Sequence, residues 1–222
     1  MDWWENESIL PFRSPTTCMV SGATMSGKTH FIYRILLNAN GMFEIPPQKI
    51  IYCYSQYQPL YEEMERNITN LVLYQGLPSK EQIEEWTEGI KHTLVILDDL
   101  MTQVAKSEET VAVFSITAHH KNCTVFFLTQ NLFFQSKNFR SLSLNCHYVV
   151  LFRSLRDSRQ ILSFGAQVYP GQSSFFKDAY QKATSKSYGY LLVDMNPASH
   201  DKYRLRTHIF PQEETLIYLP KE

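Results

Sequence analysis

The stretch SGATMSGKTH at positions 21–30 constrains the fold more than any other part of this sequence. It contains the pattern G-x-x-x-x-G-K-T, in which two glycines are followed by Lys28 and Thr29. The glycines permit a tight loop whose backbone N–H groups converge on an anion, while the lysine adds a positive charge and the threonine a hydroxyl group. A loop of this kind requires a buried strand before it and a helix after it.

The flanking residues meet that requirement. TTCMVS before the loop is a short apolar run typical of a strand, and the apolar residues at 31, 32, 35 and 36 after it follow a helical period. The start of that helix would point its free N–H groups at a phosphate group. We therefore expect a nucleotide-binding loop made of Gly22, Ala23, Thr24, Met25, Ser26, Gly27, Lys28, Thr29 and His30.

Short apolar runs alternate with helix-like segments along most of the chain, which predicts an α/β fold with a mostly parallel sheet and helices on both faces. We interpret the pattern as a P-loop NTPase of the additional-strand type, built as a single domain over 1–222 with short extensions at 1–15 and 211–222. The expected strands are 18–21, 49–55, 70–75, 93–99, 123–130, 147–153 and 190–195. The expected helices are 28–38, 80–88, 101–119, 157–165 and 173–184.

Polar residues end two of the expected strands. TLVILDD places Asp98 and Asp99 at the C-terminal edge of the sheet, where ligands of α/β proteins bind. Asp98 is expected to hold Mg²⁺ together with Thr29, and Asp99 to polarise the water that attacks the γ-phosphate. Gln130, at the tip of the next strand, is the candidate sensor of hydrolysis, whereas Asn131 fits a turn equally well.

Other nucleotide-binding classes fit less well. A GTPase would show an Asn-Lys-x-Asp motif, which the sequence lacks, and a nucleotide kinase commonly has an acidic residue where this chain reads Ser55-Gln56-Tyr57. An ATPase that uses ATP and Mg²⁺ is therefore favoured.

We expect the protein to stay inside a cell. No apolar run approaches the roughly 18 residues of a membrane span, and the acidic start MDWWENE lacks the pattern of a signal peptide. The four cysteines lie in or beside apolar runs, so we expect buried thiols and no disulfide framework.

Charge is uneven along the chain, although the net charge is only −1. The acidic run within 61–88 is interpreted as a solvated face. The stretch 137–159 carries five basic residues against Asp157 alone, and Asp157-Ser158 is a candidate helix N-cap.

Several longer motifs together resemble the FtsK–HerA superfamily, specifically the small genome-packaging ATPases of poxviruses, other large eukaryotic DNA viruses and Polinton or adintovirus-like elements. The resemblance covers nearly the whole chain. It rests on SGATMSGKTHFIYRIL, YQGLPS, LVILDDLM, AHHKNCTVFFLTQNLF, LFRSLRDSRQI and YGYLLVDMNPASHDKYRLRTHIFP.

The resemblance implies a homo-oligomeric ring that hydrolyses ATP at subunit boundaries and drives double-stranded DNA into a capsid. It implies capsid or portal partners and a location in the host nucleus or a cytoplasmic virus factory, with the virion as a further location. It also implies an arginine finger within 153–159, for which Arg156 is the first choice and Arg159 the second. Two alternatives stay open: a HerA-like pump without a capsid, and a non-hydrolysing scaffold that binds nucleotide.

Overall fold

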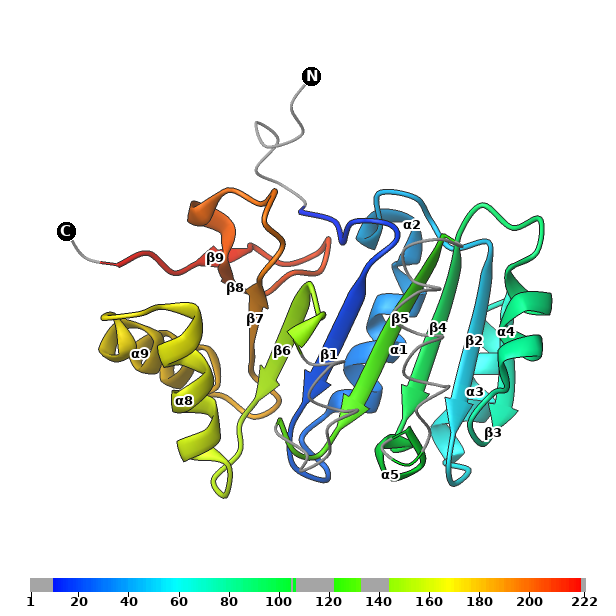
Figure 1. Ribbon diagram of the computed structural model, residues 1–222, viewed down its shortest axis with the longest axis horizontal. Helices are drawn as coiled ribbons and strands as arrows, with labels where there is room; N and C mark the ends of the chain where they lie inside the picture. Colours follow the sequence, from blue (N-terminus) through cyan, green and yellow to red (C-terminus); the bar gives the residue numbers. More distant parts are fainter. Residues whose placement is uncertain (1–9, 105, 107–121, 133–143, 221–222) are drawn as a thin grey trace.

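The computed structural model describes residues 10–104, 106, 122–132 and 144–220. Within these residues the chain forms a nine-stranded sheet in the order β3-β2-β4-β5-β1-β6-β7-β8-β9 (Figure 1). The strands are β1 Thr17–Ser21, β2 Lys49–Tyr54, β3 Leu71–Gln75, β4 Thr93–Asp98, β5 Cys123–Thr129, β6 Tyr148–Phe152, β7 Tyr190–Asp194, β8 Leu205–Thr207 and β9 Leu216–Ile217.

The strand order confirms the additional-strand P-loop architecture. The strands from β3 to β6 run parallel, and β5 lies between β1 and β4. In the register of the sheet, Ser21 is opposite Thr129, and Leu128 is opposite Asp98. Because parallel strands end at the same edge, the residues that follow β1, β4 and β5 meet there.

Helices cover both faces of the sheet, as expected from strands that are apolar throughout. One core packs α1 and α3 against the sheet, and the other packs α4, α8 and α9. Figure 1 shows α8 and α9 beside β6 and β7 at one end of the sheet. The described helices are α1 Lys28–Leu37, α2 Ala39–Met42, α3 Pro59–Asn67, α4 Lys80–Thr87, α5 Met101–Val104, α8 Ser158–Val168 and α9 Ser173–Ala183.

The sequence predictions missed α3, β8 and β9. In α3 only Tyr61 and Met64 are buried, so charged residues hide its period. The strands β8 and β9 have three and two residues and depend on antiparallel pairing with β7 and with each other. Of the helix predicted over 101–119, only Met101–Val104 lies in a described helix, and most of the rest falls outside the described residues.

Other expectations are confirmed in part. All four cysteines are free and buried, and burial raises the pKa of Cys123 and Cys146 to about 12. The glutamates of the acidic run are exposed. Asp157 does occupy the N-cap position of α8, but its side chain does not cap the helix. Its carboxylate instead accepts a hydrogen bond of 2.9 Å from the hydroxyl of Ser154.

The extensions predicted at 1–15 and 211–222 both contribute to the folded body where they are described. Phe12 is 2% exposed and forms a bridge with Phe43, and β9 extends the sheet at its far edge. That residues 1–222 form a single domain stays a prediction.

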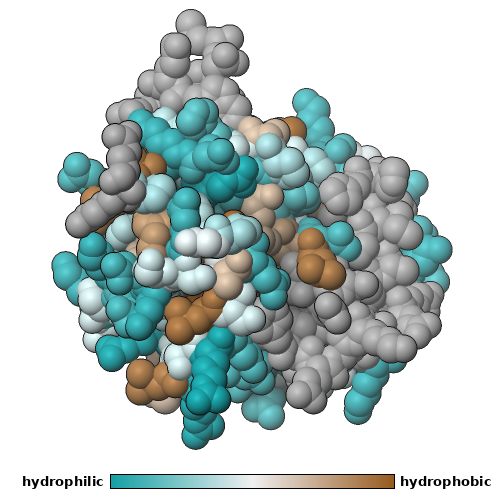
Figure 2. Space-filling model, turned by 60° about the vertical axis from the view of Figure 1, so that its left-hand side comes forward, coloured by the Kyte–Doolittle hydropathy of each residue, from teal (hydrophilic) through white to brown (hydrophobic). Residues whose placement is uncertain are grey.

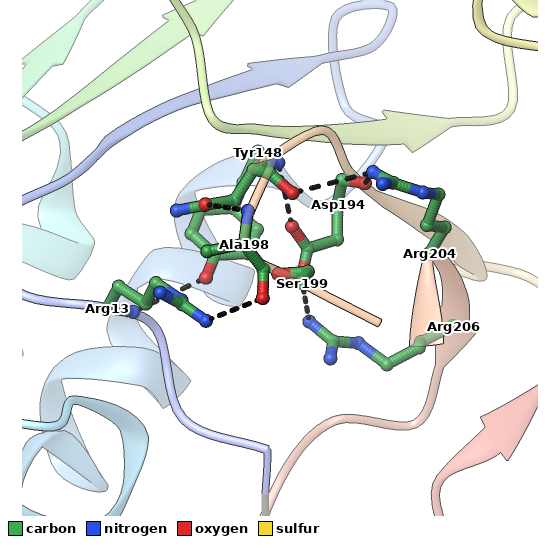
Figure 3. Close-up of polar contacts among 8 residues, drawn as sticks. Arg13, Tyr148, Asp194, Ala198, Ser199, Arg204 and Arg206 are labelled. Atoms are coloured by element: carbon green, nitrogen blue, oxygen red, sulfur yellow. Dashed lines mark hydrogen bonds and ion pairs between the residues drawn. The ribbon is translucent and has the colours of Figure 1, made fainter. Parts of the chain in front are cut away.

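A buried ion pair joins β7 to β8, and a nearby hydrogen bond joins the loop after β7 to the N-terminal segment (Figure 3). The guanidinium of Arg206 lies 3.4 Å from Asp194, and both side chains are nearly inaccessible. Ser199 donates a hydrogen bond of 2.9 Å to the same carboxylate oxygen, and Arg13 donates to the carbonyl of Ala198 at 3.2 Å. A buried charge is tolerated only when paired in this way, so the network fixes β7 and β8 relative to the start of β1.

None of the described helices is long and apolar enough to cross a membrane.

Candidate functional site

A cavity of about 750 Å³ opens at the C-terminal edge of the parallel strands. This volume lies within the range of small-molecule sites in proteins. Seven of the nine predicted loop residues line it, from Thr24 to His30. The other two, Gly22 and Ala23, lie behind them at the end of β1.

The two motif glycines are required by the geometry of the loop. A Cβ atom on Gly22 would lie 2.6 Å from the Cβ of Phe152, so a larger residue would collide with β6. Gly27 has a φ of 101°, a value that residues other than glycine rarely adopt, and it is the N-cap of α1. The free N–H groups of that helix start therefore face the cavity.

Lys28 lies at the centre of the loop. Its ammonium donates hydrogen bonds to the carbonyl oxygens of Gly22 at 2.7 Å and Ala23 at 3.0 Å. Burial lowers the pKa of Lys28, while the carboxylates of Asp98 and Asp99 oppose that shift. The charge is thus partly desolvated and close to the acids, where its interaction with a phosphate is stronger than in water.

Asp98 is the most constrained acid of the site. It is 5% exposed, and one oxygen, Oδ2, accepts hydrogen bonds from Tyr52 at 2.6 Å, Tyr61 at 3.1 Å and Thr29 at 3.5 Å. Burial raises the pKa of Asp98, and the two tyrosine hydroxyls act in the opposite direction. The hydroxyls therefore both orient the carboxylate and favour its charged form.

Sequence reasoning missed Tyr52 and Tyr61. Tyr52 lies within an apolar strand, and Tyr61 within the acidic run, so each looks like an ordinary core or surface aromatic residue. Only the pairing of β2 with β4 and the packing of α3 bring both hydroxyls to Asp98. No local signal marks them.

The oxygen donors of Thr29 and Asp98 fit the requirements of Mg²⁺. The threonine hydroxyl and the aspartate carboxylate lie 3.5 Å apart and face the same cavity. Mg²⁺ prefers hard oxygen ligands and usually takes only one or two from the protein, with phosphate oxygens and waters as the rest.

Asp99 and Gln130 are brought together from neighbouring strands. Asp99 follows β4 with a φ of 57°, a left-handed conformation that turns its exposed carboxylate toward the cavity mouth. The amide of Gln130 donates a hydrogen bond of 3.4 Å to that carboxylate. Asn131 lies in a turn in which its N–H group contacts the hydroxyl of Thr129 at 3.2 Å.

The predicted arginines lie outside the cavity. Arg153, Arg156 and Arg159 are exposed, and none of them lines the cavity of its own chain. Arg153 and Arg156 lie in the connection between β6 and α8, and Arg159 lies in the first turn of α8. Figure 2 turns this end of the molecule forward, and hydrophobic residues appear there as separate spots among hydrophilic ones. A role for either candidate finger at the phosphates would require a second subunit.

The tyrosine contacts give a testable expectation. If Asp98 holds Mg²⁺, removing the hydroxyl in Tyr52→Phe should weaken nucleotide binding in the presence of Mg²⁺ by about 10-fold, because partners that orient a metal ligand typically contribute that much. Binding in EDTA should not change. Tyr33→Phe is the matched control, since its hydroxyl contacts Glu63. Equal weakening of Tyr52→Phe with and without Mg²⁺ would show that the hydroxyl supports packing only.

The sequence matches no protein-family model, and no curated protein is significantly similar to it. Solved structures are similar in fold. The genome packaging NTPase B204 from Sulfolobus turreted icosahedral virus 2, in complex with ATP-gammaS, has a TM-score of 0.56 at 12% identity, over 94% of this chain and 98% of that one. The same NTPase in complex with AMP has a TM-score of 0.52 at 16% identity, over 82% and 94%.

A third structure, the DNA-packaging ATPase B204 from Sulfolobus turreted icosahedral virus, has a TM-score of 0.55 at 12% identity, over 94% of this chain and 98% of that one. These likenesses establish a shared fold. This is the fold that the resemblance of the sequence motifs to viral packaging ATPases predicts.

Proposed function

We propose that the protein is an Mg²⁺-dependent ATPase that translocates double-stranded DNA and packages a viral or virus-like genome into a capsid. One observation carries the ATPase: Lys28 and Thr29 from the loop face Asp98, Asp99 and Gln130 from two other strands across one cavity. The packaging role is supported by the shared fold with viral genome-packaging NTPases that have been solved with nucleotides.

The chain's own groups suit hydrolysis of a phosphoanhydride. The loop N–H groups and Lys28 would bind the β- and γ-phosphates, and Thr29 and Asp98 would hold Mg²⁺, which supplies charge neutralisation when bound. The carboxylate of Asp99 would accept a hydrogen bond from water and take its proton as the water oxygen attacks the γ-phosphorus. ADP leaves, and inorganic phosphate is formed.

Gln130 fits the part of a sensor. Its amide donates to Asp99 at 3.4 Å, so it would lie close to a water bound by Asp99 and to the γ-phosphate that this water attacks. Gln130 follows β5, which pairs with both β1 and β4. A movement of Gln130 on loss of the γ-phosphate would therefore be transmitted to the strands on either side of β5. Positioning and electrostatics of this kind are the main sources of catalysis in phosphoryl transfer.

The proposed DNA transport involves several copies of the chain. We infer a homo-oligomeric ring in which an arginine from the segment 153–159 reaches the cavity of the neighbouring subunit, with capsid or portal components as further partners. The exposure of Arg156 and Arg159 outside their own cavity is consistent with that arrangement. The ring would act inside the host cell, in the nucleus or in a cytoplasmic virus factory, or with the virion.

The direct test measures ATP turnover with and without double-stranded DNA. We expect hydrolysis that DNA stimulates, and DNA binding that weakens steeply as salt rises, because phosphate contacts release counterions.

Asp99→Asn should bind Mg²⁺-ATP normally yet turn it over more slowly by a factor on the order of 10² or greater, since the base for water is lost. Asp178→Asn, an exposed acid on α9, is the control.

The outcomes separate the candidate functions. Nucleotide binding without turnover in the parent protein would identify a scaffold that uses nucleotide only to assemble. DNA-stimulated turnover in a protein that does not associate with capsid components would favour a HerA-like pump with no capsid. Tight, salt-insensitive binding of one DNA sequence would contradict translocation, because a pump has to accept whatever sequence passes.

A further inference from the structure

The nucleotide cavity has two chemically different ends. In the sheet, β1 and its loop lie between β5 and β4 on one side and β6 and β7 on the other. The end beside β4 and β5 carries Asp98, Asp99 and Gln130. If the γ-phosphate lies beside these groups, as the proposed function requires, the base has to lie at the opposite end. That end is lined by the aromatic residues Phe31, Phe152, Tyr188 and Tyr190.

Three of the four rings are buried and pack against one another. Phe31, Phe152 and Tyr190 are each less than 7% exposed, and their ring centroids lie 4.7 to 5.8 Å apart. The hydroxyl of Tyr190 accepts a hydrogen bond of 3.0 Å from the N–H group of Ile209. Tyr188 differs, because 72% of it is exposed although it lines the same cavity. It is the ring of this group with a face open to a ligand.

The backbone at Tyr188 is held in an unfavourable conformation. Its φ is 61°, in the left-handed region that bulky residues rarely enter. The next residue, Gly189, cannot carry a side chain, because a Cβ atom there would lie 2.5 Å from the carbonyl oxygen of Ala183. The N–H group of Gly189 donates to Lys186 at 3.1 Å and closes the turn. Conformational strain of this kind is concentrated at functional sites.

The tyrosine ring lies beside Gly27 of the phosphate-binding loop. A Cβ atom on Gly27 would lie 2.9 Å from Cδ1 of Tyr188, so the ring edge packs on the loop at the start of α1. From there the ring lines the cavity on the β6 and β7 side of the loop that would hold the phosphates. This is the side on which the sugar and base have to leave the loop.

The geometry points to Tyr188 as the platform on which the base of the bound nucleotide stacks. The inference rests on the proposed function, because it takes the position of the γ-phosphate from it. Every base offers a π-face to an aromatic ring, so Tyr188 contributes affinity for nucleotides and little discrimination between bases. The rest of the fold offsets the free-energy cost of the strained backbone. The ring is therefore in position before the ligand binds.

The test compares ligands with and without a base. Tyr188→Asn removes the ring and suits the left-handed backbone, since asparagine adopts it readily, and Tyr188→Phe keeps the ring. Binding of ADP and of inorganic tripolyphosphate is measured for the parent and both variants. We expect Tyr188→Asn to bind ADP about 10-fold more weakly or worse, with tripolyphosphate affinity unchanged, and Tyr188→Phe to behave as the parent.

Thermal unfolding supplies a second measurement. Because the ring is mostly exposed and its backbone is strained, Tyr188→Asn should have the same melting temperature as the parent or a higher one. Weaker ADP binding in a variant that is no less stable would support a ligand role, since a purely structural residue would lose stability.

Three results would overturn the inference. Equal losses of ADP and tripolyphosphate affinity in Tyr188→Asn would show that the ring only braces the loop. Unchanged ADP affinity in Tyr188→Asn would place the base elsewhere, and the proposed ATPase would stand. A parent protein that binds neither ligand would remove the nucleotide site itself, and the proposed function would fall with it.

Discussion

Lys28→Ala should abolish nucleotide binding and reduce ATP turnover by a factor on the order of 10³ or more, since a preorganised donor in a water-poor site contributes about that much. The ammonium lies 2.7 and 3.0 Å from the loop carbonyls of Gly22 and Ala23, and both aspartates interact with its charge, so the substitution removes a cation held at the centre of the loop. The fold should survive, because the side chain belongs to neither hydrophobic core.

Binding of a non-hydrolysable ATP analogue and steady-state turnover provide the measurements, with circular dichroism as the check on folding. Lys80→Ala is the matched control, since Lys80 is exposed on α4 and does not line the cavity. Parental turnover in Lys28→Ala would rule out the loop at 22–29 as the phosphate site.

Arg156→Ala should lower turnover by about 10³ or more if its guanidinium completes a neighbouring site, because an arginine that neutralises charge on the γ-phosphate contributes that much. The structure leaves Arg156 exposed and outside its own cavity. The loss should therefore appear in turnover, while nucleotide binding to a single subunit stays close to that of the parent.

A mixing experiment shows whether the arginine acts between subunits. Arg156→Ala and Lys28→Ala subunits should each be inactive alone and regain part of the turnover when combined, because an intact loop then meets an intact arginine. Arg159→Ala tests the second choice, and Arg66→Ala, which removes an exposed arginine paired with Glu62, is the control. Mixed oligomers without recovered activity, together with parental turnover in Arg156→Ala, would exclude Arg156 and favour a DNA-facing role for the basic segment.

The parts of the site that follow strands could be predicted from the sequence. The run TLVILDD predicts a buried parallel strand, because both faces of such a strand are apolar. The two acids directly after the apolar residues are thereby placed at the strand's end. The same reasoning placed Gln130 at the end of β5 and the loop at the end of β1. Parallel strands share one edge of the sheet, so the sequence places these groups at that edge, and the strand order β4-β5-β1 brings them into one cavity.

The arginines show where such reasoning stops. Their positions after β6 follow from the strand pattern, but the geometry of one chain puts them on its surface. The N-cap expected at Asp157 lies at the right residue, yet the carboxylate contacts Ser154 and leaves the helix start uncapped by a side chain. Both details depend on what lies nearby in space.

The sequence by itself determined the loop, the alternation of strands and helices, and the acids and amide at the strand ends, because each is encoded within a few consecutive residues. Only the tertiary structure decided that β5 separates β1 from β4, that Tyr52 and Tyr61 converge on Asp98, and that Tyr188 leans on Gly27. Those arrangements join segments far apart in the chain. They arise from the packing of whole strands and helices, which leaves no periodic or local pattern in the residues that take part.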